Sequence, residues 1–208
     1  MKKLLVLLFS IFFLLSPSVF ADDISDFEIE GMSIGDSLLD YMTKDEILEG
    51  IEETKDRYPW LNEPYKYAQI LLKKEFSTYD FVSIYIKNNS TNQYITDRSE
   101  KYTIESISGT ISYIENFDGC IAKRNEIAEV LSKMFQEADK RNGTFISPAD
   151  SSGDSFIDVI EFRFPLGAEI EVQCKNLEES FRIQKNWTEG LTIDISNKEV
   201  VKWISDTK

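Results

Sequence analysis

The chain has no histidine and only two cysteines among its 208 residues. Without histidine it cannot form a Ser–His or Cys–His dyad, so the most familiar nucleophilic hydrolase mechanisms are excluded. The lack of histidine and of a second cysteine pair also disfavours a zinc site. We therefore expect a protein without enzymatic activity. The alternative is a hydrolase that works with carboxylates alone.

Long apolar runs are confined to the first residues, MKKLLVLLFSIFFLLSPSVFADD. Lys2 and Lys3 precede an apolar segment that is short for a membrane-spanning helix, and Val19 and Ala21 occupy the positions that a signal peptidase reads. No cysteine follows that could accept a lipid. We predict that residues 1–21 are a cleaved signal peptide, which leaves a bacterial periplasmic or secreted protein without a stable membrane anchor.

Basic residues are few: 23 lysines and arginines stand against 37 aspartates and glutamates, a net charge of −14. Once Lys2 and Lys3 leave with the signal peptide, 21 basic residues face 37 acidic ones, which gives −16. Such a surface repels a phosphate backbone and anionic lipid, so we expect no nucleic-acid partner. An unidentified protein or small ligand remains as the expected partner, and no cofactor is required.

The two cysteines, Cys120 and Cys174, both lie in the exported part of the chain. An oxidising compartment favours their pairing, and the bridge would close a loop of about 55 residues, worth about 4 kcal/mol in the chain-entropy description. The alternative is a pair of free thiols or metal ligands. We predict a disulfide.

The exported residues, 22–208, are predicted to form one domain. Its N-terminal part, 22–75, consists of helices and loops, and residues 76–208 form a sheet with a helix. Within the first part, TKDE at 43–46 is a capping-box pattern, so a helix is expected from Lys44 towards Thr54. A short helix is also expected around 67–73.

Two-residue alternation in the second part predicts strands in DFVSIYIK, YTIESISGTISYI, SFIDVIEFRF, EIEVQC and LTIDIS. The first two are expected to form an antiparallel pair. A long helix should begin at Asp118 and end at Gly143, with Cys120 on its core-facing side. Residues Val200, Trp203 and Ile204 indicate a short final helix. The fold class is α+β: an antiparallel sheet of about five strands with a long helix on one face, stapled by one disulfide.

Two glycines in EGMSIGDSLLDYM, Gly31 and Gly35, raise the possibility of a phosphate-binding loop. Such a loop needs a lysine directly after the turn, but the next lysine is Lys44. Asp36 places a negative charge at the helix start, where a phosphate would have to lie. We interpret the segment as a corner between a strand and a helix.

The segment DSSGDSFIDVIEF resembles a calcium-binding loop of twelve residues. The glycine expected at the sixth position is Ser155, and Pro148 interrupts the helix that should lead in. A solvated loop that enters a strand is the preferred interpretation, and a calcium-binding module is the alternative. Its ligands would be Asp150, Ser152, Asp154, Asp158 and Glu161.

Aromatic residues gather in RYPWLNEPYKY, where Trp60, Tyr65 and Tyr67 lie close in sequence. If exposed, they would form a contact for a protein or ligand. If buried, they would close one end of the sheet. The three are candidate binding residues.

The segments FEIEGMSIGDSLLDYMTKDEI, YTIESISGTISYI, CIAKRNEI and EVQC resemble a group of small exported bacterial proteins of unassigned function with an EGxSIGDSLLDY-type start. The resemblance covers most of the exported chain. It implies a periplasmic or secreted setting and carries over no catalytic or binding residue. GMSIGDSLLDYM also resembles the helix entry of small outer-membrane assembly lipoproteins, but the lipid-bearing cysteine of those proteins is missing here.

Overall fold

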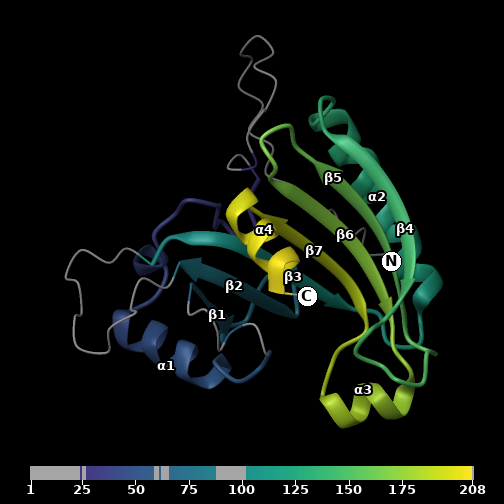
Figure 1. Ribbon diagram of the computed structural model, residues 1–208, viewed down its shortest axis with the longest axis horizontal. Coiled ribbons are helices and arrows are strands. Elements are labelled where there is room, and N and C mark those ends of the chain that lie inside the picture. The colour runs from purple at the N-terminus through teal and green to yellow at the C-terminus, as the bar shows by residue number, and fades with distance from the viewer. Residues whose placement is uncertain (1–23, 25–26, 59–60, 62–65, 88–101, 208) are drawn as a thin grey trace, which may run out of the picture.

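A computed structural model describes residues 24, 27–58, 61, 66–87 and 102–207. These residues form one seven-stranded antiparallel sheet in the order β1-β2-β3-β7-β6-β5-β4, with helices on both faces (Figure 1). The strands are β1 (Tyr67–Leu72), β2 (Phe81–Lys87), β3 (Ile104–Ser112), β4 (Asp139–Ile146), β5 (Phe156–Arg163), β6 (Glu169–Asn176) and β7 (Gly190–Ser196). The helices are η2 (Leu38–Asp40), α1 (Lys44–Thr54), α2 (Phe117–Met134), α3 (Glu179–Lys185) and α4 (Lys198–Thr207).

The sheet has seven strands where about five were predicted, because β1 and β4 were not expected as strands. The expected helix around 67–73 is wrong: this segment is β1, paired with β2 along its whole length. The first four residues of β1 are all buried, so the segment shows no alternation of apolar and polar residues. A short, continuous apolar run fits a strand or a buried helix equally well.

The long helix ends earlier than predicted and begins with a different cap. Asn116 rather than Asp118 caps α2, through its side-chain oxygen and the N–H of Gly119. The helix stops at Met134 because Phe135 leaves the helical conformation and packs edge-on against Phe164, with ring centroids 5.0 Å apart. The chain then turns and enters β4, in which Gly143 is a strand residue.

Side chains of the strands divide between two faces, which we call the covered face and the open face. The covered face packs against α1 and α2. One of its cross-strand rows is entirely buried and apolar: Ile84, Ile107, Ile195, Ile170 and Phe162. The adjacent row points to the open face and is entirely polar: Ser83, Ser108, Asp194, Glu171 and Glu161.

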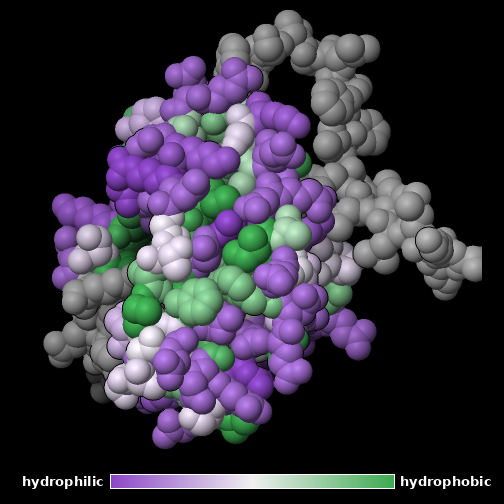
Figure 2. Space-filling view, turned by 90° about the vertical axis from the view of Figure 1, so that its right-hand side faces the viewer, coloured by the Kyte–Doolittle hydropathy of each residue, from purple (hydrophilic) through white to green (hydrophobic). Residues whose placement is uncertain are grey.

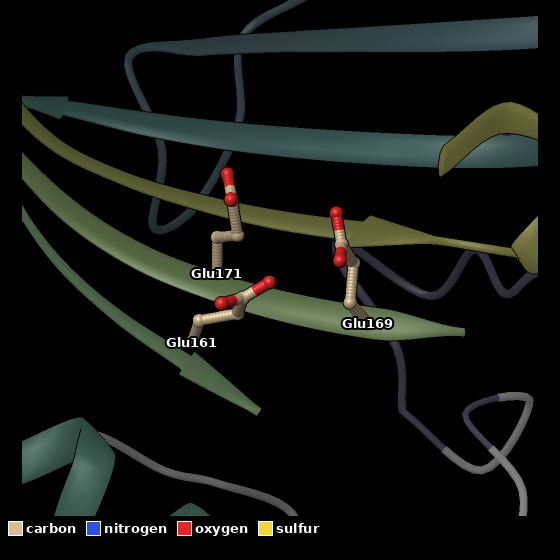
Figure 3. Close-up of side chains that lie close together, drawn as sticks. All are labelled: Glu161, Glu169 and Glu171. Atoms are coloured by element: carbon tan, nitrogen blue, oxygen red, sulfur yellow. The ribbon is translucent and has the colours of Figure 1, made fainter. Parts of the chain in front are cut away.

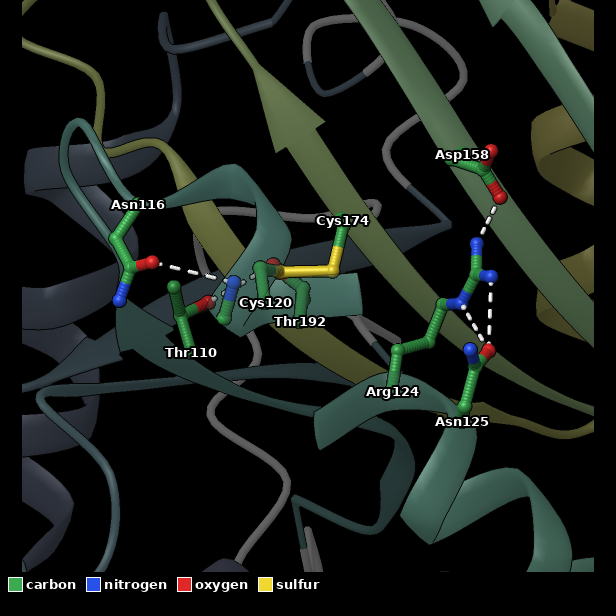
Figure 4. The surroundings of a disulfide bond; sticks show 9 residues. Thr110, Asn116, Cys120, Arg124, Asn125, Asp158, Cys174 and Thr192 are labelled. Atoms are coloured by element: carbon green, nitrogen blue, oxygen red, sulfur yellow. Dashed lines mark hydrogen bonds and ion pairs between the residues drawn. A yellow bond between two sulfur atoms is a disulfide. The ribbon is translucent and has the colours of Figure 1, made fainter. Parts of the chain in front are cut away.

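The disulfide between Cys120 and Cys174 fastens α2 to the covered face, as predicted, with the two Cα atoms 6.0 Å apart (Figure 4). Both cysteines are fully buried. One helical turn after Cys120, the guanidinium of Arg124 reaches across to the carboxylate of Asp158 on β5. Burial lowers the pKa of Arg124, and the ion pair compensates the charge that α2 carries into this layer.

The N-terminal part lies against the β1 end of the sheet. Thr43 and Glu46 form the predicted capping box at the start of α1, and the helix covers exactly the expected Lys44–Thr54. Gly50 of α1 lies so close to β1 that an added Cβ would stand 2.9 Å from the side chain of Ile70. The glycine therefore allows α1 to pack directly on the covered face.

Two helices lie outside the covered face. The predicted final helix is α4, which lies in front of the sheet in Figure 1, whereas α2 lies behind it. Val200 and Trp203 of α4 are buried as expected. The short helix α3, at the end of the sheet, was not predicted; Glu178 caps it by accepting from the N–H groups of Ser180 and Phe181.

Candidate functional site

The open face brings three glutamates together on two neighbouring strands. Glu161 of β5 lies directly opposite Glu171 of β6, and Glu169 precedes Glu171 by two residues, so all three point to the same side. Carboxylate oxygens of the three residues lie within 4.8 Å of one another (Figure 3). The row continues to Asp194 of β7, which lies opposite Glu171. Four acidic side chains are thus placed side by side on three strands.

The glutamates are partly enclosed by their neighbours. The side chains of Glu161 and Glu169 are only 13% and 18% exposed. Arg163 supplies positive charge: its Nε donates to Glu161 and lies 3.9 Å from Glu169. Arg163 thus balances part of the negative charge of Glu161 and Glu169 in a partly dehydrated place.

The surroundings of Glu169 change its protonation. Burial, the charge of Glu171 and the hydrogen bond with Glu161 together raise the pKa of Glu169 from the ordinary value of 4.5 to about 7. Near neutral pH the cluster therefore holds a shared proton part of the time. Chemically, the same arrangement can give up that proton and accept a cationic group in its place.

Hydroxyl groups lie beside the acidic row on β3 and β7. Ser106 and Ser196 are 2.8 Å apart across β3 and β7, and Thr110 and Thr192 are 3.3 Å apart on the same two strands. Gln173 of β6 donates to Asp194 and so orients its carboxylate. Ser106, Thr192 and Ser196 are buried. The oxygen acceptors of this face that are not fully buried are Ser83, Ser108, Thr110, Asp194, Glu161, Glu169 and Glu171.

At the β1 end, α4 covers the open face with aromatic side chains. The ring of Trp203 packs against Tyr67 and Tyr85, with centroids 4.9 and 6.0 Å away. Tyr67, one of the predicted binding residues, is thereby buried and closes this end of the sheet. The other two, Trp60 and Tyr65, lie outside the described residues.

The predicted calcium loop satisfies its own polar groups. Asp150 accepts hydrogen bonds from the N–H and the hydroxyl of Ser152 and from the N–H of Ser155. The hydroxyl of Ser155, together with the bonds from Ser152, lowers the pKa of Asp150 to about 2, so the carboxylate stays ionised and organises the turn. Asp154 is exposed.

The remaining two predicted ligands of that loop point in opposite directions. Asp158 lies on the covered face, where it accepts from Arg124 and, at 2.9 Å, from the hydroxyl of Thr144. Glu161, three residues later, lies on the open face with Glu169 and Glu171. The structure thus does not bring the set from Asp150 to Glu161 to one point, and calcium binding by that loop stays a prediction.

Sequence reasoning missed Glu169 and Glu171 as site residues. A signal for them was present, because EIEVQC alternates and PLGA turns the chain between two strands. Pairing the strands through that turn places Glu161 opposite Glu171. The missing step was the register, which the turn determines.

Other features of the described residues add little to this site. A groove of about 760 Å³ lies between the end of α1 and β1, and none of the three glutamates lines it. Among the ranges that the structure describes, no helix is both long and apolar enough to span a membrane.

Comparisons with known proteins add no evidence on function to that of the open face. No protein-family model, no curated protein and no solved structure matches the chain.

Proposed function

We propose that the protein is an exported, disulfide-stabilised binding protein without catalytic activity, which takes a positively charged ligand or partner group on the open face of its sheet. The observation that carries the proposal is the row formed by Glu161, Glu171 and Asp194 on three adjacent strands. Export is supported by the signal-like first residues and by the buried disulfide, which suits an oxidising compartment.

This row is costly for a sheet that has only a structural role. Like charges directly opposite one another destabilise neighbouring strands, and partial burial of Glu161 and Glu169 increases the cost. Threonine or valine at these positions would pair across the strands without repulsion. A bound cation or ammonium group would interact favourably with this row, which supports a positively charged ligand.

Long-range electrostatics favour the same class of ligand. The chain carries a net charge of −14, which attracts cations and speeds their encounter with the surface. The hydroxyl groups of Ser108 and Thr110 lie beside the acidic row and can accept hydrogen bonds from an ammonium or guanidinium group. The face thus combines attraction with oriented acceptors.

The proposal is tested by titrating spermine, a flexible polyamine, into ¹⁵N-labelled protein at low ionic strength. We expect amide shifts on β5, β6 and β7. The double variant E161Q/E171Q should weaken binding about tenfold. The matched control E126Q/E129Q removes the same charge from exposed positions of α2 and should change it less than about twofold.

Two results would contradict the proposal. Equal weakening by both double variants would mean that spermine responds to net charge alone. Shifts confined to the groove between α1 and β1, with no response on β5 to β7, would place the ligand elsewhere. Calcium added alone provides a further comparison, since shifts from Asp150 to Asp158 would favour the calcium-module alternative.

A further inference from the structure

The two edges of the sheet differ in how they are covered. β1, at one edge, has four consecutive buried residues and lies under α1. β4, at the other edge, is exposed at all eight positions. It pairs with β5 without any bulge from Asp139–Arg163 to Ile146–Phe156, so its outer side is regular. A long, regular and exposed edge is a template for another strand.

Only the first half of β4 carries charged side chains of the kind that discourage pairing with another strand. Arg141 pairs with Asp139 at 2.7 Å, and Lys140 donates to the hydroxyl of Ser132 on α2. The second half has neither charge nor proline, and Phe145 and Ile146 are 46% and 58% exposed. Figure 2 faces this side of the molecule, where green apolar and white near-neutral side chains interrupt the charged surface.

The net charge indicates which strand can occupy this edge. A second copy of the chain would bring two charges of −14 together, and this repulsion opposes pairing of β4 with itself. A segment of opposite charge is attracted instead. β4 itself keeps one net positive charge, because Asp139 balances Arg141 while Lys140 donates to a neutral hydroxyl; the attraction comes from the acidic remainder of the chain.

We propose that β4 accepts an extended, positively charged segment of another protein as an eighth strand of the sheet. The N–H and C=O groups on the outer side of β4 would pair with the segment, and its apolar side chains would contact Phe145 and Ile146. This surface borders the acidic row, because Arg141 of β4 lies opposite Glu161 of β5. The two proposals differ in what they require: strand addition needs backbone hydrogen bonds at β4, whereas the open-face site needs the carboxylates.

The test uses a short synthetic peptide in which lysine alternates with valine, and a counterpart with methylated backbone nitrogens. Both carry the same charge, but the second cannot donate backbone hydrogen bonds. We expect the first peptide to shift the amides of β4 and to slow their hydrogen exchange. Methylation should weaken binding by about tenfold or more.

Matched variants separate contact from charge. F145K/I146K places two lysines on β4 and should weaken the peptide about tenfold. L166K/I183K adds the same charge at two other exposed apolar positions, on the β5–β6 turn and α3, and should change binding less than about twofold. All four positions are exposed, so both variants are expected to fold.

Each remaining outcome has a defined meaning. Absence of peptide binding overturns the proposal, and so does self-association of the free protein through β4 in sedimentation experiments. Equal binding of the methylated peptide, with shifts on β5 to β7, rejects strand addition but leaves the open-face site standing. If the peptide protects β4 but spermine does not bind, strand addition stands and the open-face site is rejected.

Discussion

Two adjacent rows of the same sheet show how differently its faces are built. Ile84, Ile107, Ile195, Ile170 and Phe162 form a row that is buried under the helical layer. One residue further along the strands, the row contains two serines and three acidic residues. The first row excludes water and stabilises the fold, whereas the second concentrates like charges at a cost. We infer that stability depends on the covered face and binding on the open face.

Loss of the disulfide should have the largest effect on the covered face. The variant C120A/C174A is expected to lose about 4 kcal/mol of unfolding free energy, because its unfolded chain is no longer constrained by a loop of 54 residues. Chemical denaturation monitored by circular dichroism measures this loss. A loss below about 1 kcal/mol would mean that α2 is held to the sheet by packing alone.

Neighbouring residues of β3 provide a matched comparison of the two faces. Ile107→Ala should cost about 3 kcal/mol, because it leaves a cavity in the fully buried row. Ser108→Ala, on the next residue and the open face, should change stability by less than about 0.5 kcal/mol. Equal effects in denaturation experiments would show that the faces do not differ as described.

The ion pair on the covered face should give an intermediate effect. Asp158→Ala removes the partner of Arg124, whose guanidinium is 10% exposed, and is expected to cost about 2 kcal/mol. Asp154→Ala, in the exposed loop before β5, is the control and should be close to neutral. If the two variants unfold at the same denaturant concentration, Arg124 does not need Asp158.

The open face should reduce the unfolding free energy as the pH rises, whereas a carboxylate in an ordinary ion pair increases it. The folded-state pKa of Glu169 is raised to about 7, so the native protein holds this proton more tightly than the unfolded chain does. Its stabilising contribution is complete below pH 4.5 and is lost as the pH rises towards 7. We expect a loss of about 1–2 kcal/mol, reduced by solvent screening, which disappears in Glu169→Gln.

Denaturation at several pH values compares the wild type with this variant. The difference between their unfolding free energies isolates Glu169 from the other carboxyl groups. A difference that does not change between pH 4.5 and 8 would contradict the raised pKa.

Local signals in the sequence predicted the elements whose ends or faces are marked by single residues. The capping box of Thr43 and Glu46 defined α1, and the core-facing cysteines predicted the disulfide that the structure contains. In these cases single residues of the sequence carry the signal, even where, as in the disulfide, the contact joins distant positions.

The elements that sequence reasoning missed depend on distant contacts. β1 is buried on both sides, because α1 covers one and α4 the other, so even the polar Gln69 is buried and burial does not alternate. β4 is exposed at every position and has no apolar period, and the helix before it ends where Phe135 meets Phe164. The acidic cluster depends on the register of β5 and β6, which no single strand contains.

The most direct test is the stability and spermine affinity of the variant E161Q/E169Q/E171Q at pH 8, with the disulfide intact. If the open face is kept for binding at the cost of stability, this variant should be more stable than the wild type by about 1–2 kcal/mol and should bind spermine at least about tenfold more weakly. A variant that is less stable and binds spermine as the wild type does would contradict the division of roles between the two faces.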